Sequence, residues 1–139
     1  MPSFDLSTLS TVSRQDLLQH IIAPRPICFA STISKEGAVN LSPFSYFNIF
    51  SSHPPIVVFS PARRVRDNTS KHTLENVYEV PEVVINIADA SMVQQVSLAS
   101  HEYPRGTNEF VKAGLEMAPS EKVRPPRVKQ CKASMECRV

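Results

Sequence analysis

Residues 30–73 read ASTISKEGAVNLSPFSYFNIFSSHPPIVVFSPARRVRDNTSKHT. Two short runs with β-strand character, 27–34 and 39–42, flank a turn that contains Gly37, so the sequence predicts a β-hairpin here. The continuous apolar run 56–59 predicts a strand buried on both faces. The basic segment 63–73 then leads into a helical pattern. The chain is therefore expected to be organised around a sheet followed by a helix start.

The first strand predicts two different faces, because successive side chains point to opposite sides. One face carries Phe29 and Ile33. The other is small and polar, so a flat ring is expected to approach it closely; it carries Cys28, Ala30, Thr32 and Ser34. Pro43 cannot donate to a sheet ladder, so it is expected on an edge or at a bulge.

Outside this stretch, the pattern predicts further short elements. Residues 1–13 are expected to be a tail or cover, and 14–139 one domain. Further predicted elements are a helix at 14–22, a helix at 71–78 capped by Thr69 or Ser70, a strand at 83–88, a helix after Asp89 with Met92, Val93, Val96 and Ala99 inward, a short helix at 108–113, and a strand at 129–139. Short strands with a few helices predict a mainly β barrel or sandwich with helical additions.

Composition sets limits on the function. The net charge of +2 implies no bulk attraction to nucleic acid. Three cysteines, an odd number, argue against a disulfide framework and favour a reducing, cytoplasmic setting. No apolar run approaches the length of a membrane span, and no histidine or cysteine spacing predicts a metal site. The last predicted strand reaches the final residue, so we expect the chain to be a fragment of a longer domain.

A candidate anion site lies around the predicted helix start. Cations and free backbone N–H groups at a helix start favour an anion. The cations are Arg63, Arg64, Arg66 and Lys71, and the neighbouring hydroxyls are those of Thr69, Ser70 and Thr73. The alternative is a solvated basic loop with an ordinary cap.

Two further clusters have an open interpretation. The polar residues of the strand ends suit a phosphate or ribityl group, or equally a hydrogen-bonded edge; they are Ser31, Thr32, Asn40, Ser42 and Ser45. The aromatic residues suit a ring cradle or a core; they are Phe44, Tyr46, Phe47 and Phe50. Glu109 and Phe110 either lie over a site or only pack.

The order and spacing of these motifs resemble the flavin reductase-like family of FMN-binding split barrels. The matching segments are Pro24–Ile27, Ala30–Thr32, Asn40–Phe47, Pro54–Ser60, Lys71–Thr73 with Asn76, Val84–Asn86, Glu109–Phe110, Gly114–Leu115 and Glu136–Cys137. This chain departs from the family pattern at His72, where an Asp is usual, and in lacking a further C-terminal part of several dozen residues.

The resemblance implies a Greek-key split barrel, a homodimer, and FMN bound near the dimer interface. It implies that Lys71 and Thr73 hold the phosphate, with Arg66 as a helper. The whole cofactor-binding set then comprises Ser31, Thr32, Asn40, Ser42, Phe44, Ser45, Arg66, Lys71 and Thr73.

The leading hypothesis from the sequence is an FMN-dependent oxidoreductase. NAD(P)H would reduce the flavin, which would pass electrons to free flavin, oxygen or a partner monooxygenase, and no protein acid, base or nucleophile is expected to be indispensable. One alternative is a flavin-binding electron carrier without nicotinamide activity. Another is a β-barrel interaction module whose basic segment 122–138 contacts an acidic partner.

Overall fold

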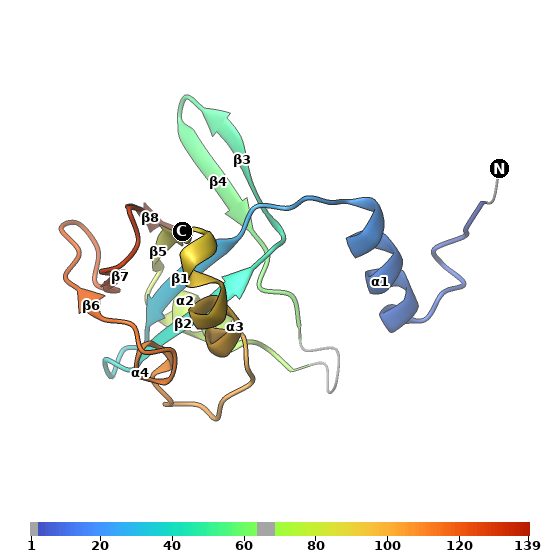
Figure 1. Ribbon diagram of the computed structural model, residues 1–139. Helices are drawn as coiled ribbons and strands as arrows, with labels where there is room; N and C mark the ends of the chain where they lie inside the picture. Colours follow the sequence, from blue (N-terminus) through green and yellow to red (C-terminus); the bar gives the residue numbers. More distant parts are fainter. Residues whose placement is uncertain (1–2, 64–68) are drawn as a thin grey trace.

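The computed structural model describes residues 3–63 and 69–139 (Figure 1). A four-stranded antiparallel sheet forms its centre in the order β2-β1-β5-β8. These strands are β1 (Cys28–Ile33), β2 (Val39–Phe44), β5 (Glu82–Ile87) and β8 (Ala133–Arg138). Two small ribbons pair β3 (Phe47–Ser52) with β4 (Pro55–Phe59) and β6 (Met117–Ala118) with β7 (Arg127–Val128). The helices are α1 (Thr11–Ile21), α2 (His72–Glu79), η1 (Ala90–Met92), α3 (Val93–Ala99) and α4 (Glu109–Lys112).

The predicted hairpin of β1 and β2 is confirmed. Ala30 pairs with Ser42, and the turn contains Gly37 at φ 90°, a conformation that glycine adopts without a steric penalty. Pro43 lies opposite Phe29 on β2, which is an edge strand of the sheet. An edge strand tolerates a residue that has no backbone donor.

Apolar side chains fill both faces of the central sheet. One cluster lies beneath η1, α3 and α4: Phe29, Leu41, Met92, Ala99, Phe110, Ala113, Leu115 and Val128. The second lies on the other face: Cys28, Ala30, Phe44, Val83 and Ile85, flanked by Phe47, Val57, Phe59, Met135 and Cys137. The expectation that the Cys28–Ala30 face of β1 admits a flat ring is therefore wrong, because aromatic and aliphatic side chains already cover it.

The prediction that residues 56–59 form a strand buried on both faces is also wrong. Strand β4 belongs to a two-stranded ribbon that projects from the central sheet (Figure 1). Its Val57 and Phe59 pack on the second cluster, whereas Ile56 and Val58 are exposed. The exposed fraction reaches 72% for Phe50 on β3. The ribbon has only one covered face, so its continuous apolar run leaves alternate side chains uncovered.

The helices differ from prediction mainly at their starts. Helix α1 begins at Thr11, three residues early, because the Ser10 side chain accepts a hydrogen bond from the Ser13 N–H. Helix α2 has Lys71 at its N-cap instead of Thr69 or Ser70. Asp89 caps η1 as predicted, while Val93 is exposed instead of facing the core. Among the helices of the described ranges, none has both the length and the apolar composition to cross a bilayer.

Asn86 is a fully buried polar hub at the centre of the sheet. Its amide nitrogen donates to the Phe29 carbonyl oxygen at 3.0 Å. Its amide oxygen accepts from the Val128 N–H and from the Ser134 hydroxyl, both at 2.9 Å. This one side chain therefore joins β1, β7 and β8 to β5.

Two carboxylates hold the proline-rich connector before β7. Glu136 accepts hydrogen bonds from the backbone N–H groups of Glu121 and Lys122, at 3.0 and 2.6 Å. Glu82 accepts from the Arg124 N–H at 2.8 Å. The connector is thus fixed to the edge of the sheet through Glu136 on β8 and Glu82 on β5.

These contacts predict a pH-dependent stability. The N–H groups of Glu121 and Lys122 hold the pKa of Glu136 below its ordinary value of 4.5. A lowered pKa in the folded state gives stability that is present above pH 4.5 and lost as the pH falls through the folded-state pKa. We expect Glu136→Gln to lower the free energy of unfolding at pH 7, by an amount that shrinks below pH 4.5. Urea denaturation between pH 7 and 3 measures this, with exposed Glu121→Gln as the control. A deficit that is independent of pH would contradict the argument.

Candidate functional site

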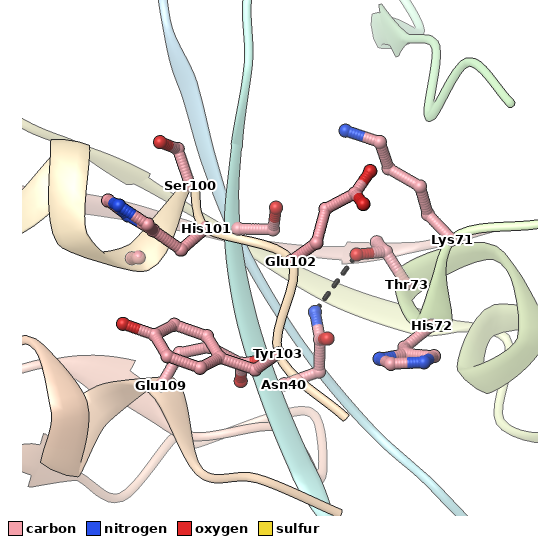
Figure 2. A pocket seen from close by; sticks show the side chains of 11 residues that line it. Asn40, Lys71, His72, Thr73, Ser100, His101, Glu102, Tyr103 and Glu109 are labelled. Atoms are coloured by element: carbon pink, nitrogen blue, oxygen red, sulfur yellow. Dashed lines mark hydrogen bonds between the residues drawn. The ribbon is translucent and has the colours of Figure 1, made fainter. Parts of the chain in front are cut away.

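A polar pocket lies where β2 meets the start of α2 (Figure 2). Three segments supply its side chains: β2, the start of α2 with its N-cap Lys71, and the stretch from the end of α3 through the loop 100–108 to the start of α4. The lining residues are Asn40, Ser42, Lys71, His72, Thr73, Ala99, Ser100, His101, Glu102, Tyr103 and Glu109. We call it the polar pocket.

A buried hydrogen bond fixes the two main walls of the polar pocket to each other. The Asn40 amide nitrogen donates to the Thr73 hydroxyl at 2.9 Å, and both residues are buried (Figure 2). One turn further along α2, the Asn76 amide donates to the Thr32 hydroxyl at 3.2 Å. We refer to the Asn40–Thr73 bond as the clasp, because it joins β2 to the start of α2.

Lys71 places a cation at the mouth of the polar pocket. It is the N-cap residue of α2, so its backbone leads directly into the electropositive end of that helix. Its Nζ lies 5.2 Å from the centre of the Phe44 ring, a distance at which a cation is attracted to the ring face. The position combines a positive charge, a helix start and the Thr73 hydroxyl, which suits a phosphate group.

Glu109 is a buried carboxyl group on the opposite wall. One of its oxygens accepts a hydrogen bond from the Leu41 N–H on β2 at 3.1 Å. Burial raises the pKa of Glu109 above its ordinary value, while the backbone N–H groups of Leu41 and of Glu109 itself oppose this. Of the two interpretations from the sequence, the structure favours the one in which Glu109 lies at a site.

The loop 100–108 forms the remaining wall and is fastened to α2. Arg105 donates to Glu75 at 3.0 Å and to Glu79 at 3.4 Å. The rings of His101 and Tyr103 lie 6.2 Å apart. His101 is distant in sequence from Lys71 and Thr73, and the fold of the loop brings it to the lining of the same pocket.

A second hollow of about 330 Å³ adjoins the polar pocket, and Lys71 and Glu102 line both. Its other lining residues come from α1, from the end of β2 and from the segment after β4: Gln15, Gln19, Pro43, Phe44, Ser45, Tyr46, Ser60, Ala62 and Arg63. The volume lies within the range typical of small-molecule sites. We call it the ring hollow, because its size and its two aromatic side chains suit a planar ring.

Most of the predicted cofactor-binding residues converge on these two cavities. Asn40, Ser42, Lys71 and Thr73 line the polar pocket, and Phe44 and Ser45 line the ring hollow. His72 also lines the polar pocket, at the position where the family pattern has Asp.

The remaining predictions lie elsewhere. Ser31 and Thr32 are fully buried and line neither cavity. The Ser31 hydroxyl donates to the Pro126 carbonyl oxygen, while Thr32 accepts from Asn76. Contact of Ser31 or Thr32 with a cofactor therefore stays a prediction. Arg66 falls outside the described residues, so its predicted role as a helper also stays a prediction.

Comparison with known sequences identifies the family. The profile of the Flavin reductase like domain matches residues 21–139. This chain belongs to the flavin reductase-like family. A related uncharacterised protein of Aquifex aeolicus is 40% identical over 123 residues, which are 88% of this chain and 62% of that protein. This flavin reductase-like chain thus spans less than two thirds of that relative.

Solved structures agree with this assignment. Nitrilotriacetate monooxygenase component B from Bacillus cereus superposes with a TM-score of 0.92 at 33% identity, covering 99% of this chain and 67% of that one. A split barrel domain from Shewanella frigidimarina gives a TM-score of 0.80 at 22% identity, covering 96% and 64%. The predicted split-barrel fold is therefore confirmed for this flavin reductase-like chain.

Proposed function

We propose that this protein is an FMN-binding oxidoreductase of the flavin reductase type. The observation that carries the proposal is the convergence of Asn40, Ser42, Lys71 and Thr73, from two separate elements, in the polar pocket beside the ring hollow. The polar pocket offers a cation, hydroxyls and a helix start to a phosphate, and the ring hollow offers aromatic faces to an isoalloxazine. Membership of the flavin reductase-like family supports the same ligand.

Each cavity has a distinct task in this proposal. Lys71 and Thr73 hold the phosphate, with Asn40 and Ser42 beside them on β2. The side chains that line the ring hollow orient the ring and exclude water from one of its faces. When bound, the flavin supplies the redox chemistry, since it accepts a hydride and releases electrons, while the protein binds and orients it.

The electron donor and acceptor are finer parts of the proposal. We propose NAD(P)H as the donor, and a partner oxygenase, free flavin or oxygen as the acceptor; the similarity to a monooxygenase component supports the oxygenase. An electron carrier without nicotinamide activity is the second candidate. The basic interaction module is disfavoured, because cations in its segment are already paired: Lys129 with Glu116 and Lys132 with Asp89.

A homodimer is also part of the proposal. The β3–β4 ribbon exposes apolar side chains, among them Ile49 and Phe50, and such side chains favour burial in an interface. Sedimentation equilibrium with and without FMN tests this, and a monomer at all concentrations would contradict it. A cytoplasmic location stays a prediction from the sequence.

The test of the proposed function has two steps. The visible absorption spectrum of the purified protein is recorded before and after FMN is added and the excess removed. We expect a retained flavin band that NADH or NADPH bleaches under anaerobic conditions. A flavin band that only a partner protein bleaches would favour the electron carrier. A protein that retains no flavin and oxidises neither nicotinamide would overturn the proposal.

A further inference from the structure

The buried carboxyl group of Glu109 holds the edge of the central sheet at the polar pocket. Glu109 is the first residue of α4, and its neighbour Phe110 anchors that helix in the core beneath the sheet. The Asn108 side chain caps the helix by accepting from the Phe110 N–H at 3.0 Å. The carboxyl group is therefore presented from a fixed position, and its oxygen meets the Leu41 N–H of β2 at 3.1 Å.

This contact replaces a missing strand neighbour. Strand β2 is an edge strand, so alternate backbone N–H groups on its outer side have no sheet partner. Leu41 points such an N–H at Glu109, and the two residues that flank it, Asn40 and Ser42, both line the polar pocket. The path of β2 at Leu41 thus acts together with the clasp and the pairing with β1 in setting where those two side chains lie relative to Lys71 and Thr73.

We propose that Glu109 is a positioning residue of the anion site: its oxygen, acting as a hydrogen-bond acceptor, fixes β2 at Leu41 and so aligns Asn40 and Ser42 with a bound phosphate. The inference rests on the proposed function, since it concerns the same site. It adds a residue that touches the strand and not the reacting atoms.

Glu109 could act through its hydrogen-bond acceptor oxygen or through its negative charge, and the two roles predict different effects of substitution. A charged Glu109 at a phosphate site would repel the phosphate. The other ionisable groups that line the polar pocket are Lys71, His72, His101, Glu102 and Tyr103. Burial disfavours the charged form of Glu109 and agrees with a role that needs no charge. A neutral side chain with the same carbonyl oxygen is therefore expected to serve as well as glutamate.

The experiment compares two substitutions at this position with a control. Glu109→Gln keeps an acceptor oxygen, Glu109→Ala removes it, and Glu116→Ala removes an exposed glutamate outside both cavities. Dissociation constants for FMN and riboflavin are measured well below the melting temperature. Amide hydrogen exchange at Leu41 is measured in the same samples.

We expect Glu109→Ala to raise the FMN dissociation constant at least tenfold and the riboflavin constant less than threefold, because riboflavin lacks the phosphate. Glu109→Gln and Glu116→Ala should stay within threefold of wild type for both ligands. The hydrogen-exchange protection factor of the Leu41 amide should be unchanged in Glu109→Gln and should fall at least tenfold in Glu109→Ala. A loss of fold stability alone would weaken the binding of FMN and of riboflavin equally. It would therefore not produce a defect that is specific to FMN and that glutamine reverses.

Several outcomes would overturn the inference. Unchanged FMN affinity in Glu109→Ala, or a glutamine variant as weak as the alanine variant, would each do so while leaving the proposed function intact. Failure of the wild-type protein to bind FMN would overturn the proposed function and the inference with it. If Glu109→Ala does not fold, Glu109→Asp replaces it, because its shorter side chain withdraws the acceptor from Leu41 and the same results are expected.

Discussion

Replacing Lys71 with methionine is expected to raise the dissociation constant for FMN by about 10- to 100-fold. A hydrogen bond to a charged group typically contributes about 1.5–3 kcal/mol, which is a factor of about 10 to 160 in a dissociation constant and includes that range. Methionine keeps much of the length of the side chain and its packing on the Phe44 ring, so the change isolates the charge. The binding constant is measured by quenching of flavin fluorescence, for FMN and for riboflavin in parallel.

Two controls make this result specific to the phosphate. Lys112→Met removes an exposed lysine from α4, outside both cavities, and should leave both constants unchanged. Combining Lys71→Ala with Thr73→Ala should weaken FMN binding further, whereas Thr73→Ser keeps the hydroxyl of the clasp and should cost little. Unchanged FMN affinity in the Lys71/Thr73 double variant would refute the site assignment, and an equal loss for riboflavin would refute the phosphate role.

Asn86→Ala is expected to lower the free energy of unfolding by about 3–5 kcal/mol. The substitution leaves the Val128 N–H, the Ser134 hydroxyl and the Phe29 carbonyl without the partner they have now. A buried polar group left without a partner costs about 1–3 kcal/mol, and the removed side chain also leaves a void. Urea denaturation followed by far-UV circular dichroism measures the loss, since the chain has no tryptophan.

A surface asparagine provides the matched control for Asn86. Asn48 is exposed on β3, and its side-chain oxygen accepts from the adjacent Ile49 N–H, so Asn48→Ala should change stability by less than about 0.5 kcal/mol. Asn86→Asp keeps the acceptor for Val128 and loses the donor to Phe29, so its loss should grow as the pH rises and the carboxyl ionises. A loss below about 1 kcal/mol in Asn86→Ala would show that the hub does not join the strands as described.

Local sequence patterns predicted the hairpin well and placed the helix starts to within about three residues. The β1–β2 pair follows from alternation around a turn with Gly37, and these signals act within a few residues. Burial was harder to predict, because it depends on which elements cover a face. The run 56–59 is apolar enough for a buried strand, yet in the structure it lies in a two-stranded ribbon that has one covered face.

The site was predicted in part for a similar reason. Lys71 and Thr73 belong to one short motif, so their proximity follows from the chain itself. Glu109 lies 68 positions from Leu41, and no local pattern indicates that its carboxyl group meets the edge of β2. Ser31 is a different case: its hydroxyl donates to the Pro126 carbonyl oxygen, a partner 95 positions away that no local pattern indicates, and its contact with a cofactor stays a prediction.

The clasp between Asn40 and Thr73 couples ligand binding in the polar pocket to the stability of the folded chain. A ligand held by both walls binds the native chain and not the unfolded one, so it shifts the folding equilibrium by mass action. At a free ligand concentration 100 times the dissociation constant, the gain is about 2.7 kcal/mol. If FMN is that ligand, the flavin supply of a cell would govern how much of this protein survives proteolysis. A shortage of flavin would then lower the amount of the protein before it lowered the catalytic rate of each remaining molecule.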